Sequence, residues 1–166
     1  MYNTCEEDMR VGKEEEIKVL PHLCRYFNDD GLKLVSSEWE ANDYIGSSGT
    51  KYEVKTRDLK SDSSLAVEGL LINVAKVVFN NYIIWNLLDG IYVADTEEIL
   101  DDVDIKMKTI KNDRRPDERP TAVLVKRVYC VPISKCRCIT KYDILRTPKE
   151  KTGGLTRGVC HIILDD

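Results

Sequence analysis

The segment from residue 82 to residue 94 constrains the fold most, because it combines two apolar runs with a tight-turn dipeptide. Tyr82 to Leu88 is apolar and strand-like, Asp89-Gly90 follows, and Ile91 to Ala94 is apolar again. An Asp-Gly pair between two such runs is typical of the two-residue turn of a β-hairpin. The sequence therefore predicts a hairpin here and a fold that contains a β-sheet.

Two amphipathic segments predict helices. From Gly12 to Phe27, apolar residues recur at helical spacing with charges on the other face. Leu65 to Phe79 shows the same periodicity after the capping candidates Ser63 and Ser64. Pro21 lies inside the first pattern and lacks the backbone amide that a helix uses, so a kink or a break is expected there.

Five other segments have the composition and the flanking turn residues of strands: Leu32 to Glu38, Asp43 to Gly46, Thr50 to Arg57, Thr121 to Val131 and Cys136 to Thr140. Ser47-Ser48-Gly49 joins the second and third of these segments into a hairpin. The order of helix, strands, helix and strands predicts an α/β or α+β sandwich around a mixed sheet. With 166 residues, of which 42% are hydrophobic, the chain is expected to form one domain, residues 1–166.

Composition excludes several classes of protein. No apolar run approaches the roughly 20 residues of a membrane-spanning helix, and the acidic start of the chain lacks the basic and apolar parts of a secretory signal. The 6 cysteines have neither the paired spacing of a disulfide scaffold nor the Cys-x-x-Cys pairs of a zinc site. We therefore expect an intracellular protein, in the cytoplasm or the nucleus, with buried free thiols and no membrane partner.

Charge is distributed unevenly along the chain, although the net charge is only -4. The segment from Ile105 to Arg157 contains 15 Lys or Arg and 5 Asp or Glu, so the C-terminal third is basic and the remainder is acidic. Basic faces bind phosphate backbones and clustered carboxylates hold metal ions, so this segregation is typical of an enzyme that acts on nucleic acid. A solvated basic loop around Lys111 to Arg119 is the alternative interpretation.

The segment most informative about chemistry runs from residue 43 to residue 57. Alternate side chains of a strand share a face, so Glu53 and Lys55 are expected side by side while Val54 points into the core. Asp43 lies on the partner strand of the hairpin, where its carboxylate can converge with that of Glu53. Two carboxylates in one small space repel each other unless a proton or a cation lies between them, and a hard divalent ion is the usual solution.

Magnesium suits this arrangement, because it needs only one or two protein carboxylates besides water and substrate phosphate oxygens. Asp43 and Glu53 supply that number, and the carbonyl of Val54 is a candidate further ligand. Lys55 is expected to orient or deprotonate the attacking water, or to neutralise charge that develops on the phosphate. The pattern thus favours metal-dependent hydrolysis of a phosphodiester, although each element alone also fits plain surface alternation.

Asp43 followed by Glu53-Val54-Lys55, in a hairpin after a helix that carries a glutamate, resembles the PD-(D/E)xK nuclease superfamily. The resemblance covers a catalytic core of about residues 10–95 and leaves a basic, β-rich C-terminal part of about residues 105–166. It implies a restriction-endonuclease-like core and an endonuclease in recombination, repair or genome processing that uses Mg2+, or Mn2+ as a substitute. DNA is the implied substrate in preference to RNA. Compact members of this kind are found in large DNA viruses, and the similar archaeal junction resolvases work as dimers, so a virus-encoded protein and a homodimer are both compatible with the resemblance.

The resemblance also implies a carboxylate on the first helix. Gly12-Lys-Glu-Glu-Glu16 is similar to the opening helix of these nucleases, in which a glycine precedes the catalytic glutamate by four positions. Glu16 is therefore the implied catalytic residue and metal ligand on the helix, with Glu14 and Glu15 as alternatives. Asn42 stands where the family name has a proline, a variation that the superfamily often shows.

Five cations are candidates for contact with nucleic acid. Arg57 and Lys60 follow the catalytic strand and are expected to reach a phosphate next to the scissile one. Arg114 and Arg115 belong to the basic C-terminal third. Lys76 on the second helix corresponds to a lysine or glutamine that some members carry near the active site, although an ordinary exposed lysine is the favoured interpretation.

Two other functions fit the same residues. A nucleic-acid-binding module that keeps this fold without catalysis is the first, and it is favoured if Asp43 and Glu53 do not converge. A plain interaction protein is the second, and it would require no metal and would bind nucleic acid only nonspecifically.

Overall fold

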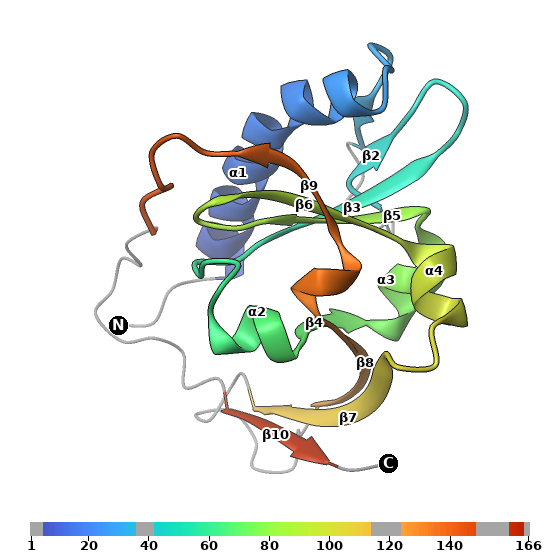
Figure 1. Ribbon diagram of the computed structural model, residues 1–166, viewed down its shortest axis with the longest axis vertical. Helices are drawn as coiled ribbons and strands as arrows, with labels where there is room; N and C mark the ends of the chain where they lie inside the picture. The colour runs from blue at the N-terminus through green and yellow to red at the C-terminus, as the bar shows by residue number, and fades with distance from the viewer. Residues whose placement is uncertain (1–4, 36–41, 114–123, 149–159, 165–166) are drawn as a thin grey trace.

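Two β-sheets lie one above the other in the computed structural model, with helices packed around and between them (Figure 1). The structure describes residues 5–35, 42–113, 124–148 and 160–164. Over these residues the strand order is β1-β2-β3-β5-β6-β9 in the larger sheet and β10-β7-β8-β4 in the smaller one. The architecture is α+β with a mixed sheet, which confirms the expected fold class at this level.

The larger sheet contains both predicted hairpins. Its strands are β1 (Lys33–Leu34), β2 (Tyr44–Ile45), β3 (Lys51–Thr56), β5 (Tyr82–Asn86), β6 (Gly90–Asp95) and β9 (Arg137–Lys141). Neighbouring strands are antiparallel except β3 and β5, which are parallel. The apolar run that begins at Tyr82 is therefore a central strand covered on both faces, and the C-terminal β9 completes the sheet beside β6.

The smaller sheet is antiparallel throughout its described strands, β4 (Leu70–Asn73), β7 (Lys106–Asp113), β8 (Leu124–Val131) and β10 (Cys160–Leu164). β8 confirms the strand predicted to end at Val131, whereas the sequence pattern does not predict β7 or β10. Lysines on both faces of β7 remove the alternation of apolar and polar residues that identifies a strand.

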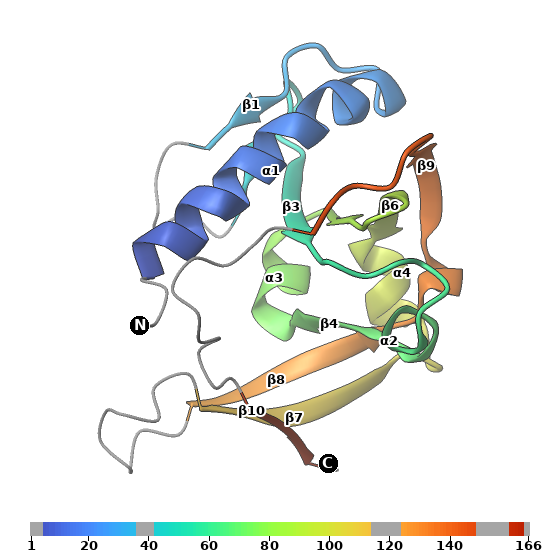
Figure 2. The same ribbon diagram turned by 90° about the vertical axis from the view of Figure 1, so that its left-hand side faces the viewer.

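The helices divide between the two faces of the larger sheet. α1 (Cys5–Tyr26) crosses the face opposite the smaller sheet (Figure 2). Val19 and Leu23 of α1 are buried against Tyr44, Val54 and Ile84 of the sheet. The other described helices are α2 (Ser64–Glu68), α3 (Val74–Phe79), α4 (Thr96–Asp101) and the short η1 (Ile133–Lys135). In the described part of the chain, no helix has the length and apolar character that crossing a bilayer requires.

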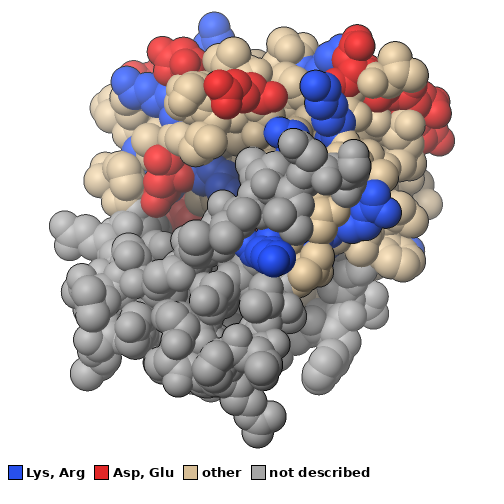
Figure 3. Space-filling model, turned by 90° about the horizontal axis from the view of Figure 1, so that it is seen from below, with Lys and Arg blue, Asp and Glu red and all other residues tan. Residues whose placement is uncertain are grey.

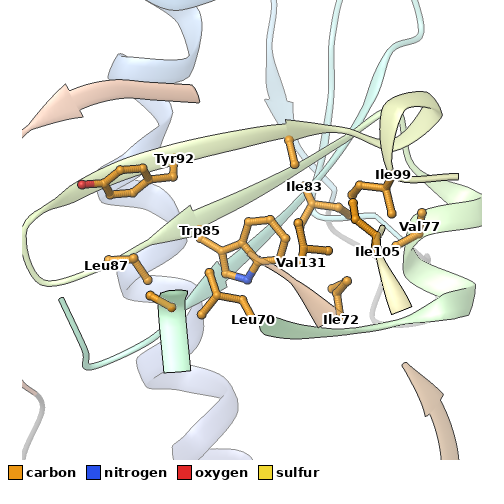
Figure 4. Packing of buried hydrophobic residues seen from close by; sticks show 12 residues of the cluster. Leu70, Ile72, Val77, Ile83, Trp85, Leu87, Tyr92, Ile99, Ile105 and Val131 are labelled. Atoms are coloured by element: carbon orange, nitrogen blue, oxygen red, sulfur yellow. The ribbon is translucent and has the colours of Figure 1, made fainter. Parts of the chain in front are cut away.

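The main apolar core lies between the two sheets (Figure 4). Trp85 of β5 is fully buried there, with Leu70 and Ile72 of β4, Val131 of β8 and Ile99 of α4 in the same cluster. Burial of apolar side chains drives folding by roughly 25 cal/mol per Å² removed from water. The core therefore joins the larger and smaller sheets into one folded unit over the described residues.

The prediction of a single helix from Leu65 to Phe79 is wrong. The segment forms α2, then β4, then α3, and only the capping role of Ser63 is confirmed, because its side chain accepts the amide of Ala66. Gly69 ends α2, and a Cβ at this position would lie 2.8 Å from the Cβ of Cys130 in β8. The close approach of β8, which pairs with β4, overrides the local helical periodicity.

The first helix differs from its prediction in two ways. α1 begins at Cys5, before the predicted start at Gly12, and it continues through Pro21 without a break. Proline removes one helical hydrogen bond, but Val19 and Leu23 on either side of it are buried against the same face of the sheet. Packing of both halves on one surface holds the helix together across the proline.

Replacing Gly90 by alanine is expected to destabilise the larger sheet, because a Cβ there would lie only 2.4 Å from the carbonyl oxygen of Thr140 in β9. The two strands would have to separate, and overpacking of this kind costs roughly 1–3 kcal/mol. Chemical denaturation monitored by circular dichroism measures the loss. An unchanged free energy of unfolding would show that β9 does not press on β6 in solution.

Candidate metal and nucleic-acid site

β3 presents Glu53 and Lys55 on the face of the larger sheet that is turned away from α1. Val54 packs in the cluster beneath α1, whereas the β5 partners of Glu53 and Lys55, Ile83 and Trp85, belong to the core between the sheets. The predicted alternation is confirmed. Glu53 and Lys55 lie side by side on the face of the larger sheet that is turned toward the smaller sheet.

Asp43 lies where β2 and β3 part. Tyr44 pairs with Tyr52, so Asp43 falls opposite Glu53 at the next position of the two chains. The backbone amide of Asp43 donates to the Tyr52 carbonyl at 2.9 Å, and Asp43 Oδ2 accepts the amide of Val54 at 2.8 Å. The side chain of Asp43 thus takes the place of the next backbone partner and holds a carboxylate at the opening between the strands.

The carbonyl of Val54 faces the same opening. The N–H and C=O of one strand residue point to the same side of the strand, and the N–H of Val54 points to Asp43. The carbonyl is therefore directed toward the side on which β2 has ended. Asp43, Glu53 and the Val54 carbonyl therefore place oxygen atoms at the opening between β2 and β3.

Glu53 is a buried carboxylate held by two lysines. Its side chain is 2% exposed, and its Oε1 lies 3.1 Å from Nζ of Lys55 and 3.3 Å from Nζ of Lys76. Its Oε2 is also buried and has no hydrogen-bond partner among the described residues. Buried polar atoms are normally hydrogen-bonded, so this oxygen is chemically available to a ligand.

The surroundings of Glu53 raise the pKa of its carboxyl group. Burial is the largest cause, because it disfavours the charged form, and the nearby charge of Asp43 acts in the same direction. The ammonium groups of Lys55 and Lys76 oppose the shift without cancelling it. A divalent cation at this place would favour the charged form of the Glu53 carboxylate.

The interpretation of Lys76 as an ordinary exposed lysine is wrong. Its side chain is partly buried and forms an ion pair with Glu53. α3 begins at Val74, directly after β4, and the side chain of Asn73 caps it by accepting the amide of Ala75. The position of Lys76 therefore depends on β4 and on its pairing with β8, which no local sequence signal reveals.

The glutamates of α1 lie on the other face of the sheet. The hydroxyl of Tyr44 donates to the carbonyl of Glu16 at 2.6 Å, and Glu16 contributes to the raised pKa of Tyr44 after the larger effect of burial. Glu16 is thus near Tyr44, the residue that follows Asp43 in the chain. Glu15 is 1% exposed and its Oε1 pairs with Lys18 at 3.2 Å, whereas Glu14 is exposed.

Among the described side chains, no group of three or more His, Cys, Asp or Glu is arranged to hold a metal ion. A three-carboxylate centre made of Glu16, Asp43 and Glu53 is therefore not preformed. The two carboxylates at the opening of β2 and β3 still match magnesium, which takes one or two protein carboxylates and completes its octahedron with water and phosphate.

The loop after β3 carries the predicted phosphate contacts and is fixed by a residue that the sequence analysis missed. Arg57 and Lys60 are exposed on this loop. Arg146 donates from Nη2 to the carbonyl of Arg57 at 2.9 Å and pairs through Nη1 with Asp58 at 2.8 Å. Arg146 is 89 positions from Arg57, so no local pattern could identify it. Arg114 and Arg115 lie outside the described residues.

Charged side chains are unevenly distributed over the face of the molecule that Figure 3 shows. In Figure 3 the described acidic side chains lie in the upper half of the view, and the described side chains of the lower half are basic or uncharged. Among the side chains that the structure describes, four cysteines are free thiols: Cys24, Cys130, Cys136 and Cys138. Cys138 is exposed, which corrects the expectation of burial for that residue.

Comparisons of the chain with protein-family models, with curated proteins and with solved structures found no match.

Proposed function

We propose that this protein is a magnesium-dependent nuclease of the PD-(D/E)xK type, with a restriction-endonuclease-like core, which hydrolyses phosphodiester bonds. The observation that carries the proposal is the buried carboxylate of Glu53, which contacts Lys55 and Lys76 and lies opposite Asp43 where two strands part. A buried carboxylate requires compensating positive charge. Lysines and a hard cation together supply this positive charge, and the same groups can bind the negatively charged phosphate of a phosphodiester.

Asp43 and Glu53 are the proposed carboxylate ligands of Mg2+, or of Mn2+ as a substitute, and the Val54 carbonyl is a third oxygen ligand. The oxygen Oε2 of Glu53 supports this assignment, because it is buried without a hydrogen-bond partner among the described residues. Glu16 remains a proposed catalytic residue and ligand, directly or through a bridging water, because its backbone carbonyl accepts from the hydroxyl of Tyr44, the residue next to Asp43. When bound, the ion would polarise the phosphate and favour deprotonation of a coordinated water.

The two lysines have complementary proposed roles. Lys55 orients or deprotonates the attacking water, because it follows Glu53 on the same face of β3. Lys76 approaches from α3 and neutralises charge on the phosphate that reacts. Arg57 and Lys60, on the exposed loop after β3, bind the neighbouring phosphate through charge-assisted hydrogen bonds.

The biological setting follows from the resemblance. DNA is the proposed substrate in preference to RNA. The proposed process is recombination, repair or genome processing inside a cell, and an origin of the protein from a virus is compatible with it. Action as a homodimer is proposed for the case in which two strands of a junction are cut.

A catalytically inactive nucleic-acid-binding module on the same fold is the second candidate. One observation favours it: Lys55 and Lys76 both contact Oε1 of Glu53, so the two ammonium groups already compensate the carboxylate without a metal ion. In this function the same cations would bind phosphate while no hydrolysis occurs.

The test of the proposal is cleavage of labelled single-stranded, duplex and four-way-junction DNA, and of RNA, with Mg2+ or Mn2+. Metal-dependent cutting that stops when the metal is chelated is the expected result. Binding of the same nucleic acids without cutting, by a protein that is folded by circular dichroism, would establish the binding module instead. The preferred substrate among the four identifies the structure that the enzyme recognises.

Magnesium is expected to stabilise the protein in a pH-dependent manner. At a concentration about 100 times its dissociation constant, a ligand stabilises the folded state by about 2.7 kcal/mol, which for a chain of this size raises Tm by about 5–10 °C. The metal binds the ionised carboxylate, and the pKa of Glu53 is raised above its ordinary value of 4.5. The shift in Tm is therefore present above the raised pKa and is lost as pH falls through it.

Thermal denaturation between pH 5 and pH 8, with and without Mg2+, measures this effect. Glu53→Gln is expected to remove the Mg2+-induced shift at every pH, and Glu68→Gln, on the exposed surface of α2, is expected to retain it. A shift that persists in Glu53→Gln would place the metal elsewhere.

A further inference from the structure

The outer end of the smaller sheet extends beyond β4. Asn73, the last residue of β4, pairs with Val128, so the preceding residues of β8 have no neighbour in β4. Residues 124–127 of β8 pair there with residues 109–112 of β7. We call these eight residues the outer arm. Figure 2 shows β7 and β8 running out past α3 on the side of the molecule where α1 begins.

One face of the outer arm is turned toward the larger sheet. Directly paired residues share a face of a sheet, and Tyr129 pairs with Ile72, which packs in the core between the sheets. The alternation along β8 and β7 places Arg127, Thr109, Val125 and Lys111 on this same face. Beyond the core the face becomes exposed, since Lys111 and Arg127 are exposed and Val125 is 57% exposed.

This face continues into the proposed active site. Val74 follows Asn73 and begins α3, and Arg127 precedes Val128 on the antiparallel strand β8, so α3 starts beside Arg127. α3 also contacts β8. Two positions after Val74, Lys76 reaches Glu53. Lys76, Arg127 and Lys111 therefore follow one another along the side of the smaller sheet that faces the larger sheet.

The outer arm carries a net positive charge. Its residues are Thr-Ile-Lys-Asn in β7 and Leu-Val-Lys-Arg in β8, with three cations and no Asp or Glu. Phosphodiester backbones carry one negative charge per nucleotide and are bound chiefly through Lys and Arg. The outer arm is positively charged, and Lys111 and Arg127 on its inner face are exposed and lie in line with Lys76. Such a surface suits a polyanion that passes the proposed active site.

We propose that the surface of the outer arm formed by Lys111 and Arg127 binds backbone phosphates of the nucleic acid on one side of the scissile bond. The proposal rests on the proposed function and deepens it, because it names an extended nucleic acid as the substrate class. A nucleotide or a very short oligonucleotide would reach Lys55 and Lys76 but would gain nothing from the arm.

The experiment compares two double variants that remove the same charge from opposite faces of the smaller sheet. Lys111→Gln with Arg127→Gln alters the face toward the active site, and Lys106→Gln with Lys108→Gln alters the other face of β7. Both are made in a Glu53→Gln background, so that binding to labelled DNA and RNA is measured by fluorescence anisotropy without cleavage. Far-UV circular dichroism establishes that each variant is folded.

The Lys111/Arg127 variant is expected to weaken binding of a long nucleic acid about tenfold and to reduce the slope of log affinity against log salt concentration by about 2. The Lys106/Lys108 variant is expected to bind as its parent does. In the background with Glu53 intact, the Lys111/Arg127 variant is expected to raise KM for long substrates with kcat unchanged, and to leave a short oligonucleotide unaffected.

Equal weakening by both variants would overturn the proposal, because charge alone, and not the face, would then determine binding. Unchanged binding by the Lys111/Arg127 variant would overturn it as well, even if the enzyme cuts. Weakened binding by that variant alone, in a protein that never cuts any substrate, would support the arm while contradicting the nuclease function. Comparison of single-stranded DNA, duplex DNA and RNA identifies which backbone the arm prefers.

Discussion

Replacement of Glu53 by glutamine is expected to abolish metal-dependent cleavage, with a loss of rate of about 10³-fold or more. The substitution keeps the shape of the side chain but removes the negative charge of the proposed ligand, whose side chain is only 2% exposed. A metal ion supplies several kcal/mol of transition-state stabilisation, and each 1.36 kcal/mol corresponds to about a factor of ten in rate. Loss of about 4 kcal/mol therefore gives a decrease of about 10³-fold.

Lys55→Ala separates metal binding from chemistry in the same assay. A lysine that assists the nucleophile or the transition state contributes roughly 10²- to 10⁴-fold, so a loss of this size is expected while the Mg2+-induced rise in Tm persists. Glu68→Gln and Lys60→Ala are the matched controls, since both residues are exposed. Glu68→Gln should cut like the wild type, and Lys60→Ala should affect KM more than kcat.

Single-turnover cleavage rates with Mg2+ and with Mn2+ measure these effects. Metal-dependent cutting by Glu53→Gln at the wild-type rate would exclude Glu53 as a ligand and would remove the basis of the proposed function. Equal loss of the thermal shift in Lys55→Ala and Glu53→Gln would show that Lys55 acts on metal binding and not on the chemical step.

Replacement of Trp85 by alanine is expected to destabilise the protein by about 3–5 kcal/mol. Trp85 is fully buried between the two sheets, in the cluster that contains Leu70 of β4 and Val131 of β8. Domains are stable by only about 5–15 kcal/mol, so this variant is expected to be partly unfolded at elevated temperature. Trp85 in β5 pairs with Lys55 in β3. Loss of its side chain is therefore expected to reduce cleavage together with stability.

Urea denaturation followed by far-UV circular dichroism measures the loss, with Phe79→Ala as the control. Phe79 lies on α3 and is 57% exposed, so its truncation is expected to change stability by no more than about 0.5 kcal/mol. A loss in Trp85→Ala as small as that of Phe79→Ala would show that the two sheets do not share one core in solution.

Several features of the fold are predictable from local sequence because local geometry controls them. Asp89-Gly90 between two apolar runs predicts the β5–β6 hairpin, and the alternation of Glu53, Val54 and Lys55 predicts which side chains share a face. Chain direction and strand periodicity alone determine these relations. The same local reasoning predicts Asp43 on the strand that neighbours Glu53, and the register of the hairpin places the two residues opposite each other.

Other features depend on partners that are distant in the sequence. The helical periodicity from Leu65 to Phe79 is real, but pairing of β4 with β8 extends its middle part into a strand. The position of Lys76 follows from that pairing, because α3 begins where β4 ends. Arg146 reaches the loop at Arg57 only because the chain after β9 returns to the ends of β3 and β5.

By itself, the sequence determined the elements that short-range geometry governs: the hairpins, the amphipathic first helix and the pairing of Asp43 with Glu53. Only the tertiary structure decided which groups surround Glu53. It brought Lys76 to that carboxylate, joined the backbone of Glu16 to Tyr44, and turned one side of the outer arm toward the larger sheet. The physical reason is that strand pairing and burial between sheets join residues far apart in the chain, and their free energy exceeds the small local preferences of each segment.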